Sequence, residues 1–110
     1  MLRRTVLVLS TVGTRADADR IAQALVGERL AACVNVVPGL ASTYRWKGAV
    51  ETAQEVLLII KTRGERLEEL ESRLRALHPY DVPEMVVLPI AGGHGPYLDW
   101  IAESVSGAGG

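Results

Sequence analysis

The chain has 110 residues, of which 48% are hydrophobic and 23% charged, and its formal net charge is -1. This length favours a single domain, and the near balance of 12 basic and 13 acidic residues excludes a general attraction to nucleic acid. The single cysteine excludes an internal disulfide, so the redox context is unconstrained and a reducing cytoplasm is the default expectation.

The first predicted element is a buried strand over residues 4–12, RTVLVLSTV, which is rich in valine and leucine. Two arginines precede the apolar residues, as in a secretion signal. The apolar stretch is short, however, and no small-residue cleavage site follows it. No run approaches the roughly 18 apolar residues that a membrane span needs. We therefore expect no membrane partner.

A helix should follow this strand, because Thr14 and Asp17 have the spacing of a capping box. Two strands are predicted next, over residues 31–46 and 49–62, with a tight turn between them at Lys47-Gly48. Pro38-Gly39 interrupts the first of these strands, so a bend or bulge is expected there. The helix has one apolar stripe, formed by Ala18, Ile21, Ala22 and Leu25.

The two long strands do not fit a compact monomer. A strand of about 14 residues reaches about 46 Å at about 3.3 Å per residue. A domain of this size has a diameter of only roughly 35 Å. The hairpin over residues 40–58 must therefore bend sharply or project, with Tyr44 and Trp46 at its tip. Exposed aromatic rings and unpaired strand edges predict a homo-oligomer formed by edge pairing or strand exchange.

A second helix is predicted from a capping box at Thr62 and Glu65 to His78-Pro79, where proline ends it. Its charged residues are interpreted as a solvated face. A fourth strand over 85–91 and a short terminal helix that starts at Gly95-Pro96 complete the order. Right-handed crossovers then give an α+β, ferredoxin-like βαββαβ sandwich with an additional C-terminal helix. We expect one domain over 1–105 and a flexible tail over 106–110.

Local spacing provides no metal or catalytic signature. No C-x-x-C, H-x-x-x-H or H-E-x-x-H pattern occurs, and there is no nucleophile elbow or phosphate-binding loop. Cys33 is typical either of a small buried hydrophobe or of a metal ligand. His78 is suited equally to a helix cap and to a functional role. His94 lies in the loop AGGHGP and is interpreted as solvent-exposed.

The segment HPYDVPE, residues 78–84, combines two prolines with an imidazole, a phenol and two carboxylates. The prolines should fix the path from the second helix into the fourth strand. Tyr80 and Glu84 would then be held toward a ligand or a neighbouring subunit. The alternative is that Asp81 and Glu84 only satisfy backbone amides and Lys61 at a subunit contact.

Five stretches in this order and spacing resemble the CutA family of divalent-cation tolerance proteins: RLAACVNVVPG, STYRWKG, VLLIIKT, HPYDVPEMVVLPI and YLDWI. The resemblance covers residues 5–102. It implies a ferredoxin-like protomer in a PII-like homotrimer, with clefts between subunits and no established enzymatic activity. Bacterial members are associated with tolerance of copper and other divalent ions.

The resemblance also implies site residues. The copper-ligand candidates are Cys33 of the ACVN motif and His78 of the HPY motif, with Glu84 as a neighbouring carboxylate. The tip sequence YRWKG is more basic than the family pattern, and His94 is an imidazole that the pattern does not require. The inter-subunit cleft would be lined by Tyr44, Trp46, Lys61, Tyr80, Pro83, Glu84 and Trp100.

The function implied is that of a trimeric, non-enzymatic, cytoplasmic protein that responds to divalent cations and binds copper or a similar ion weakly. Copper fits the candidate ligands, since imidazole suits Cu(II) and thiolate suits Cu(I). No organic cofactor is implied. The alternative is a PII-like small-molecule sensor or interaction scaffold, in which Arg45, Lys47 and Lys61 would contact an anion such as a nucleotide in the clefts.

Overall fold

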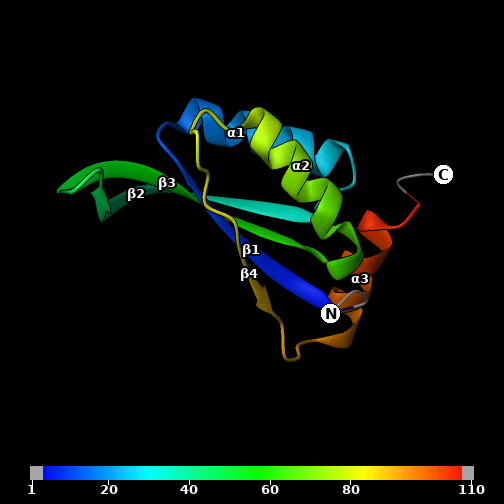
Figure 1. The fold of residues 1–110 in the computed structure, drawn as a ribbon. Coiled ribbons are helices and arrows are strands. Elements are labelled where there is room, and N and C mark those ends of the chain that lie inside the picture. The colour runs from blue at the N-terminus through cyan, green and yellow to red at the C-terminus, as the bar shows by residue number, and fades with distance from the viewer. Residues whose placement is uncertain (1–3, 108–110) are drawn as a thin grey trace.

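The computed structural model describes residues 4–107, and in these it has a four-stranded antiparallel sheet and three α-helices (Figure 1). The strands lie in the order β2-β3-β1-β4, which is the predicted ferredoxin-like arrangement. Of the predicted tail over 106–110, residues 108–110 lie outside the described residues. The elements are β1 (Thr5–Val12), α1 (Arg15–Gly27), β2 (Cys33–Trp46), β3 (Ala49–Arg63), α2 (Leu67–Leu77), β4 (Val86–Pro89) and α3 (Gly95–Val105).

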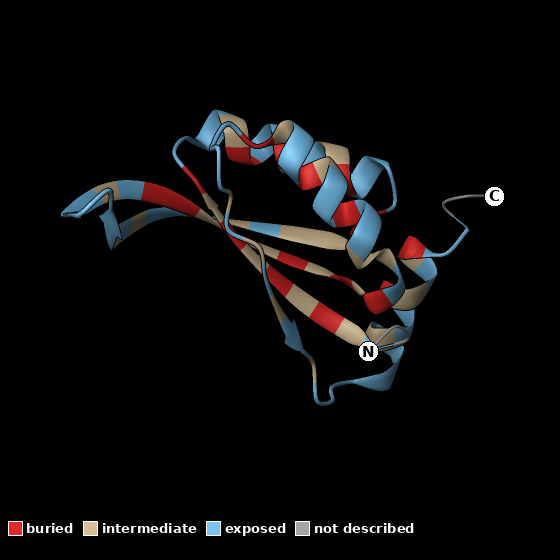
Figure 2. Cartoon of the chain, in the orientation of Figure 1, coloured by how far each residue is buried: buried red, intermediate tan, exposed pale blue. Residues whose placement is uncertain are grey.

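Helices α1 and α2 cover one face of the sheet, and the core lies between these two layers (Figure 2). Every second residue of β1 is buried, as the alternation of side chains in a strand requires. The same alternation on β3 buries Val56, Leu58 and Ile60. Ile21 and Leu25 of α1 and Leu70 and Leu74 of α2 fill the space above them.

The two helices begin differently. Thr14 caps α1 as predicted, because its hydroxyl accepts a hydrogen bond from the amide of Asp17 at 3.1 Å. The predicted capping box at Thr62 and Glu65 is wrong. Thr62 is still part of β3 and fully buried, and its hydroxyl donates to the Leu30 carbonyl at 2.7 Å. A 3-10 turn over Gly64–Arg66 precedes α2, which has no side-chain cap.

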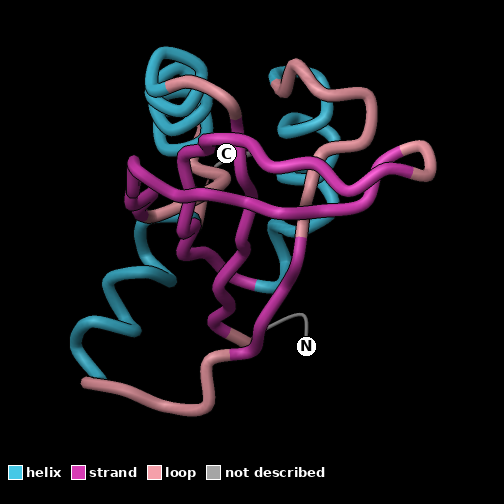
Figure 3. The backbone as a smooth tube through the Cα atoms, turned by 90° about the vertical axis from the view of Figure 1, so that its left-hand side faces the viewer, coloured by secondary structure: helices cyan, strands magenta, loops and turns pink. Residues whose placement is uncertain are grey.

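The hairpin of β2 and β3 projects beyond the helices (Figure 1), and in Figure 3 its projecting end faces the viewer. The molecule is 44 Å along its longest axis but only 22 Å along its shortest. Lys47 and Gly48 form the tip with φ angles of 49° and 83°, the left-handed pair that a two-residue hairpin turn needs. The predicted bulge is present, since the register shifts between Val37 and Leu40.

The other face of the sheet is apolar and has no helix layer like that of α1 and α2 over it (Figure 1). Leu7 and Leu9 of β1 are in register with Leu88 and Val86 of β4, which are 42% and 47% exposed. Helix α3 packs at the end of the sheet remote from the hairpin tip, through a separate small cluster of Ala32, Leu98, Ile101 and Val105. In the described part of the chain, no helix is both long and apolar enough to cross a membrane.

Candidate functional site

A groove of about 710 Å³ lies between the projecting hairpin and residues 78–84, which we call the joint. This volume falls in the range of pockets that bind small molecules. Thr11, at the end of β1, lines the groove between the two walls. The hairpin provides Ser42, Thr43, Tyr44, Trp46, Glu51 and Glu55, and the joint provides Pro79, Tyr80, Asp81, Val82 and Glu84.

The bulge in β2 determines which hairpin side chains reach the groove. Val37 pairs with Leu57, but Leu40 pairs with Glu55, so β2 gains one residue over this interval. Because successive side chains face opposite sides of a strand, the extra residue changes which of them share a face with Glu55. Tyr44 thereby lies directly opposite Glu51 on the groove face.

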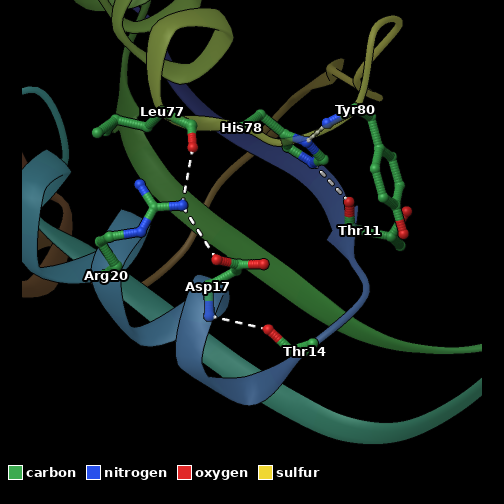
Figure 4. Close-up of polar contacts among 7 residues, drawn as sticks. All are labelled: Thr11, Thr14, Asp17, Arg20, Leu77, His78 and Tyr80. Atoms are coloured by element: carbon green, nitrogen blue, oxygen red, sulfur yellow. Dashed lines mark hydrogen bonds and ion pairs between the residues drawn. The ribbon is translucent and has the colours of Figure 1, made fainter.

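His78 anchors the joint to β1 (Figure 4). The residue is buried, and its ring Nε2 lies 2.8 Å from the Thr11 carbonyl oxygen, while Nδ1 lies 3.1 Å from the Tyr80 amide nitrogen. A carbonyl oxygen only accepts, and an amide only donates. His78 therefore carries its hydrogen on Nε2, and both ring nitrogens already have partners.

Arg20 fixes the other end of the joint. Its guanidinium donates to the Leu77 carbonyl at 3.0 Å and to the Asp17 carboxylate at 3.1 Å (Figure 4). The Arg20 hydrogen bond, followed by that of Thr14, holds the pKa of Asp17 below its usual range. The last carbonyls of α2 are thus tied to α1 before the chain turns into the groove.

Tyr80 joins the two walls of the groove. Its hydroxyl donates to Glu55 Oε2 at 2.7 Å, and its ring lies 4.7 Å from that of His78. Partial burial of the phenol, together with the neighbouring Glu55 carboxylate, raises the pKa of Tyr80 to about 12. The hydroxyl is therefore a stable donor to Glu55 at neutral pH.

The groove is strongly acidic. Four of the residues that line it carry carboxylates, and none of the lining residues is basic. Glu55 and Glu84 accept hydrogen bonds from hydroxyl groups, those of Tyr80 and Thr11. In residues 4–107 the ion pairs lie elsewhere, on the two helices and their flanks. The negative charges of the groove therefore have no cationic partner within the described chain.

The predicted metal ligands do not form a site in one chain. Glu84 and His78 both contact Thr11, whereas Cys33 pairs with Lys61, which pairs with Leu7 of β1. Leu7 and Thr11 are four positions apart on β1, so Cys33 lies roughly 13 Å along the strand direction from the end of β1 that His78 and Glu84 contact. No group of three or more metal-binding side chains occurs within residues 4–107. Metal binding by Cys33, His78 and Glu84 stays a prediction.

The predicted cleft residues fall into two groups. Tyr44, Trp46, Tyr80 and Glu84 all line the groove, but Pro83 does not. Lys61 and Trp100 lie at the other end of the sheet, where both contact Tyr97. In one chain Lys61 is thus bonded to Tyr97 and not to Glu84. His94 is exposed, as predicted, at the start of α3.

Sequence reasoning missed Thr11, Glu51 and Glu55 as groove residues. The two glutamates lie four residues apart on β3, which places them on the same face of a strand. That spacing was a usable signal. The side of the sheet that they face, however, depends on the position of the bulge in β2.

Comparison with known proteins agrees with this fold. The family model described as CutA1 divalent ion tolerance protein matches residues 6–104. The chain belongs to this family. The predicted resemblance is therefore confirmed. The Divalent-cation tolerance protein CutA of Thermus thermophilus is 56% identical over 98 residues, which are 89% of this chain and 95% of that protein. The protein of that name from Pectobacterium atrosepticum is 42% identical, over 91% of each chain.

Solved structures with the same fold include the divalent cation tolerance protein of Thermus thermophilus. It is 54% identical, with a TM-score of 0.91 over 93% of this chain and 99% of that one. CutA1 of Oryza sativa is 44% identical, with a TM-score of 0.92 over 96% of this chain and 97% of that one. The chain spans only 55% of the chloroplastic CutA protein of Arabidopsis thaliana, to which it is 48% identical. The relatives are named for ion tolerance and not for a reaction.

Proposed function

We propose that this CutA family protein acts in divalent-cation tolerance as a cytoplasmic, non-enzymatic homotrimer, and that its acidic groove binds copper or a similar ion weakly. The observation that carries the proposal is the groove itself, where four carboxylates meet no basic lining residue. Such a surface lowers the electrostatic energy of any divalent cation that approaches it. The family assignment over residues 6–104 supports the link to divalent ions.

The uncovered sheet face supports self-association. Leu7, Leu9, Val86 and Leu88 form one continuous apolar surface opposite the helices, and Val37, 40% exposed, extends it on β2. Large exposed apolar patches are typical of protein interfaces. The long edge of β2 adds unpaired backbone groups beside this surface. A second and third copy of the chain would cover both.

The arrangement of the groove favours weak over tight ion binding. A tight site needs several ligands at fixed distances, and no such group exists among the described residues. The carboxylates would each contact an ion that keeps much of its water. The ion is therefore bound as a transient solute and not as a resident cofactor.

His78 has a structural role that opposes metal binding. A copper ion on Nδ1 would displace the Tyr80 amide, and one on Nε2 would displace the Thr11 carbonyl. Either event would break a part-buried hydrogen bond, at a cost of about 0.5–1.5 kcal/mol. Copper binding through Nε2 would thus require the joint to detach from β1, whereas binding through Nδ1 would release the Tyr80 amide within the joint.

The alternative function, an anion or nucleotide sensor, has less support in this groove. Arg45 and Lys47 lie at the exposed hairpin tip, and Lys61 is bonded to Tyr97 at the far end of the sheet. None of the three lines the groove. An anion there would face four carboxylates without a compensating charge.

The test is calorimetric titration of Cu(II) into chelator-stripped protein, with the mass of the particle measured by light scattering. We expect saturable, weak uptake by a particle of three chains. The double variant Asp81→Asn with Glu84→Gln should take up less copper. The matched control, Glu68→Gln with Glu71→Gln, removes two charges from the exposed face of α2 and should behave as the unchanged protein does.

A second variant tests the predicted ligands themselves. If Cys33→Ala with His78→Gln binds copper with unchanged affinity, neither residue belongs to the site. Equal losses in the groove variant and the α2 control would show diffuse attraction to a negative protein and would contradict a site in the groove. A monomeric particle would contradict the trimer.

A further inference from the structure

Helix α3 docks on the sheet through a small apolar contact of its own. Its buried residues Ile101 and Val105 meet Ala32, and this cluster is separate from the core beneath α1 and α2. An isolated helix of 11 residues is unstable in water, so α3 depends on its contacts with the rest of the chain. So small a cluster leaves part of the docking to polar contacts.

The C-terminal end of α3 has no cation of its own. No residue in its last turn is basic, and its two charged side chains, Asp99 and Glu103, are both acidic. The last carbonyls of a helix form the negative end of its dipole, so they favour a nearby positive charge. For α3 this charge comes from two other segments of the chain.

Arg29 and Arg66, which we call the arginine pair, donate to these carbonyls. Arg66, in the 3-10 turn before α2, donates from Nε to the Val105 carbonyl at 2.9 Å, and its side chain is only 13% exposed. Arg29, in the turn between α1 and β2, donates to the Ser104 carbonyl at 3.3 Å. The pair therefore ties the end of α3 to the segments that lead into β2 and α2.

Arg29 has a backbone conformation that favours glycine. Its φ angle is 60°, and its amide donates to the Val26 carbonyl at 3.1 Å, beyond the end of α1. A left-handed residue commonly ends a helix, and a side chain there brings strain that glycine avoids. The turn alone would thus favour glycine, and the contact with Ser104 gives a reason for arginine.

The first turns of α3 carry two aromatic rings. The ring centroids of Tyr97 and Trp100 are 5.4 Å apart, and in one chain the residues are 42% and 43% exposed. The Lys61 ammonium lies 5.6 Å from the Tyr97 ring centroid and donates to the Tyr97 hydroxyl at 3.4 Å. A helix is stiff over this length, so holding Ser104 and Val105 also fixes where these rings lie.

We propose that the arginine pair keeps α3 docked and positions Tyr97 and Trp100 beside Lys61, and that without the pair α3 detaches while the core beneath α1 and α2 stays folded. Arg29 and Arg66 are thus positioning residues for the end of the sheet where Lys61 and Trp100, two of the predicted cleft residues, lie. The inference goes beyond the proposed function and does not depend on metal binding.

Hydrogen exchange followed by mass spectrometry on the full-length protein tests the docking. In Arg66→Gln, the amides of residues 98–105 should exchange about tenfold faster, because a part-buried bond from a charged donor is lost, while β1 and β3 keep their rates. Arg66→Lys retains a charged donor and should recover part of the protection. The matched control, Arg20→Gln, loses a guanidinium contact with the Leu77 carbonyl at the end of α2 and should leave α3 unchanged.

Arg29→Gly separates a local effect from a general one. Glycine relieves the strain at this position but adds freedom to the unfolded chain, so global unfolding in denaturant should be nearly unchanged. Helix α3 should nevertheless exchange about threefold faster, since the guanidinium is lost.

The position of Trp100 is tested in a Trp46→Phe background, where it is the single tryptophan. With Arg29→Gln and Arg66→Gln added, acrylamide should quench its emission up to about twofold more strongly, since a ring that is 43% exposed becomes open to solvent. Arg20→Gln in the same background should change nothing. Light scattering measures the particle mass of every variant.

Unchanged exchange in α3, or equally faster exchange throughout the chain, would overturn the proposal. Faster exchange confined to variants whose particle dissociates would overturn it too, because neighbouring subunits and not the arginine pair would then hold α3. Faster exchange in α3 with unchanged quenching of Trp100 would overturn the positioning role.

Discussion

Strand β3 belongs to two different environments along its length. Its C-terminal half, with Val56, Leu58, Ile60 and Thr62, is sealed beneath α1 and α2. Its N-terminal half runs out along the projecting hairpin, where residues 49–52 are all exposed (Figure 2). One continuous ladder to β2 links the two halves, interrupted only by the bulge. The strand is therefore a rigid arm that is held at one end and presents the groove at the other.

The two halves of β3 therefore have different roles: the C-terminal half stabilises the fold, and the N-terminal half carries residues of the groove. The core supplies the buried apolar area that stabilises the fold, whereas the arm buries little and is held by backbone pairing and by a few side-chain hydrogen bonds, such as that of Tyr80 to Glu55. Tyr44 and Trp46 lie on the arm, so their exposure costs the core nothing. Substitutions on the two halves of β3 should accordingly have very different consequences.

The largest effect should come from Leu58→Ala, measured against Val50→Ala on the same strand. Leu58 is fully buried, so truncation leaves a cavity, and the free energy of unfolding should fall by about 2–5 kcal/mol. Val50 is 66% exposed, and its truncation should change the same quantity by less than about 0.5 kcal/mol. Denaturant unfolding at one fixed protein concentration measures both.

The Leu58 and Val50 variants would also show whether this comparison of the two halves of β3 is wrong. A loss at Val50 as large as that at Leu58 would mean that the arm is buried in the assembled protein. Repeating the measurement at several protein concentrations would then separate the two cases, because only an intermolecular contact makes the unfolding midpoint depend on concentration.

Two threonines of β3 provide a second, smaller contrast. The Thr62 hydroxyl donates to the Leu30 carbonyl inside the core, whereas the Thr52 hydroxyl meets only that of Thr43 in an exposed pair. Thr62→Val keeps the shape but leaves a buried carbonyl without its donor, so we expect a loss of about 1–3 kcal/mol. Thr52→Val should be neutral within about 0.5 kcal/mol by the same unfolding assay. Equal losses of stability in the two variants would contradict the view that burial makes the Thr62 hydrogen bond more important than that of Thr52.

Sequence patterns predicted the core half better than the arm. Leucines at three- and four-residue spacing, at positions 67, 70, 74 and 77, indicate which face of α2 is buried. Both faces of β1 carry apolar residues, so the sequence predicted a buried strand but not which of its faces lies beneath the helices. Thr62 and Glu65 matched a capping box, but the buried hydrogen bond to Leu30 keeps Thr62 in β3. The groove depends on the bulge register and on where the joint crosses the arm, and both are tertiary features. Glu55 could not be singled out without them.

Tyr80 is where the joint fastens onto the arm, so its ionisation tests that connection. The pKa of Tyr80 is raised to about 12 in the folded protein, above the ordinary value of 10.0. The folded state therefore holds the proton more tightly, and the resulting stability is complete below pH 10 and is lost as the pH rises toward 12. Tyr80→Phe should remove that loss and, at neutral pH, cost about 1 kcal/mol for the missing bond to Glu55.

Absorbance titration of the phenolate band checks this directly. The chain has three tyrosines, and the phenylalanine variant should lack the last step of the titration, the one near pH 12. Tyr44→Phe is the matched control on the exposed arm and should leave that last step in place. A wild-type protein in which all three tyrosines titrate together near pH 10 would contradict the link between joint and arm.

The smallest effect concerns a defect within the core half itself. Ser10 lies on the buried face of β1 between Val8 and Val12, and its hydroxyl has no hydrogen-bond partner in the described structure. An unpaired buried hydroxyl costs stability, whereas alanine loses only a small volume. Ser10→Ala should therefore raise the free energy of unfolding by about 0.5 kcal/mol. Ser42→Ala, on the arm, should bring no gain, because Ser42 is partly exposed and its hydroxyl is accessible to water. A loss at Ser10 would mean that the hydroxyl has a partner in solution, and the core would then be more polar than its packing indicates.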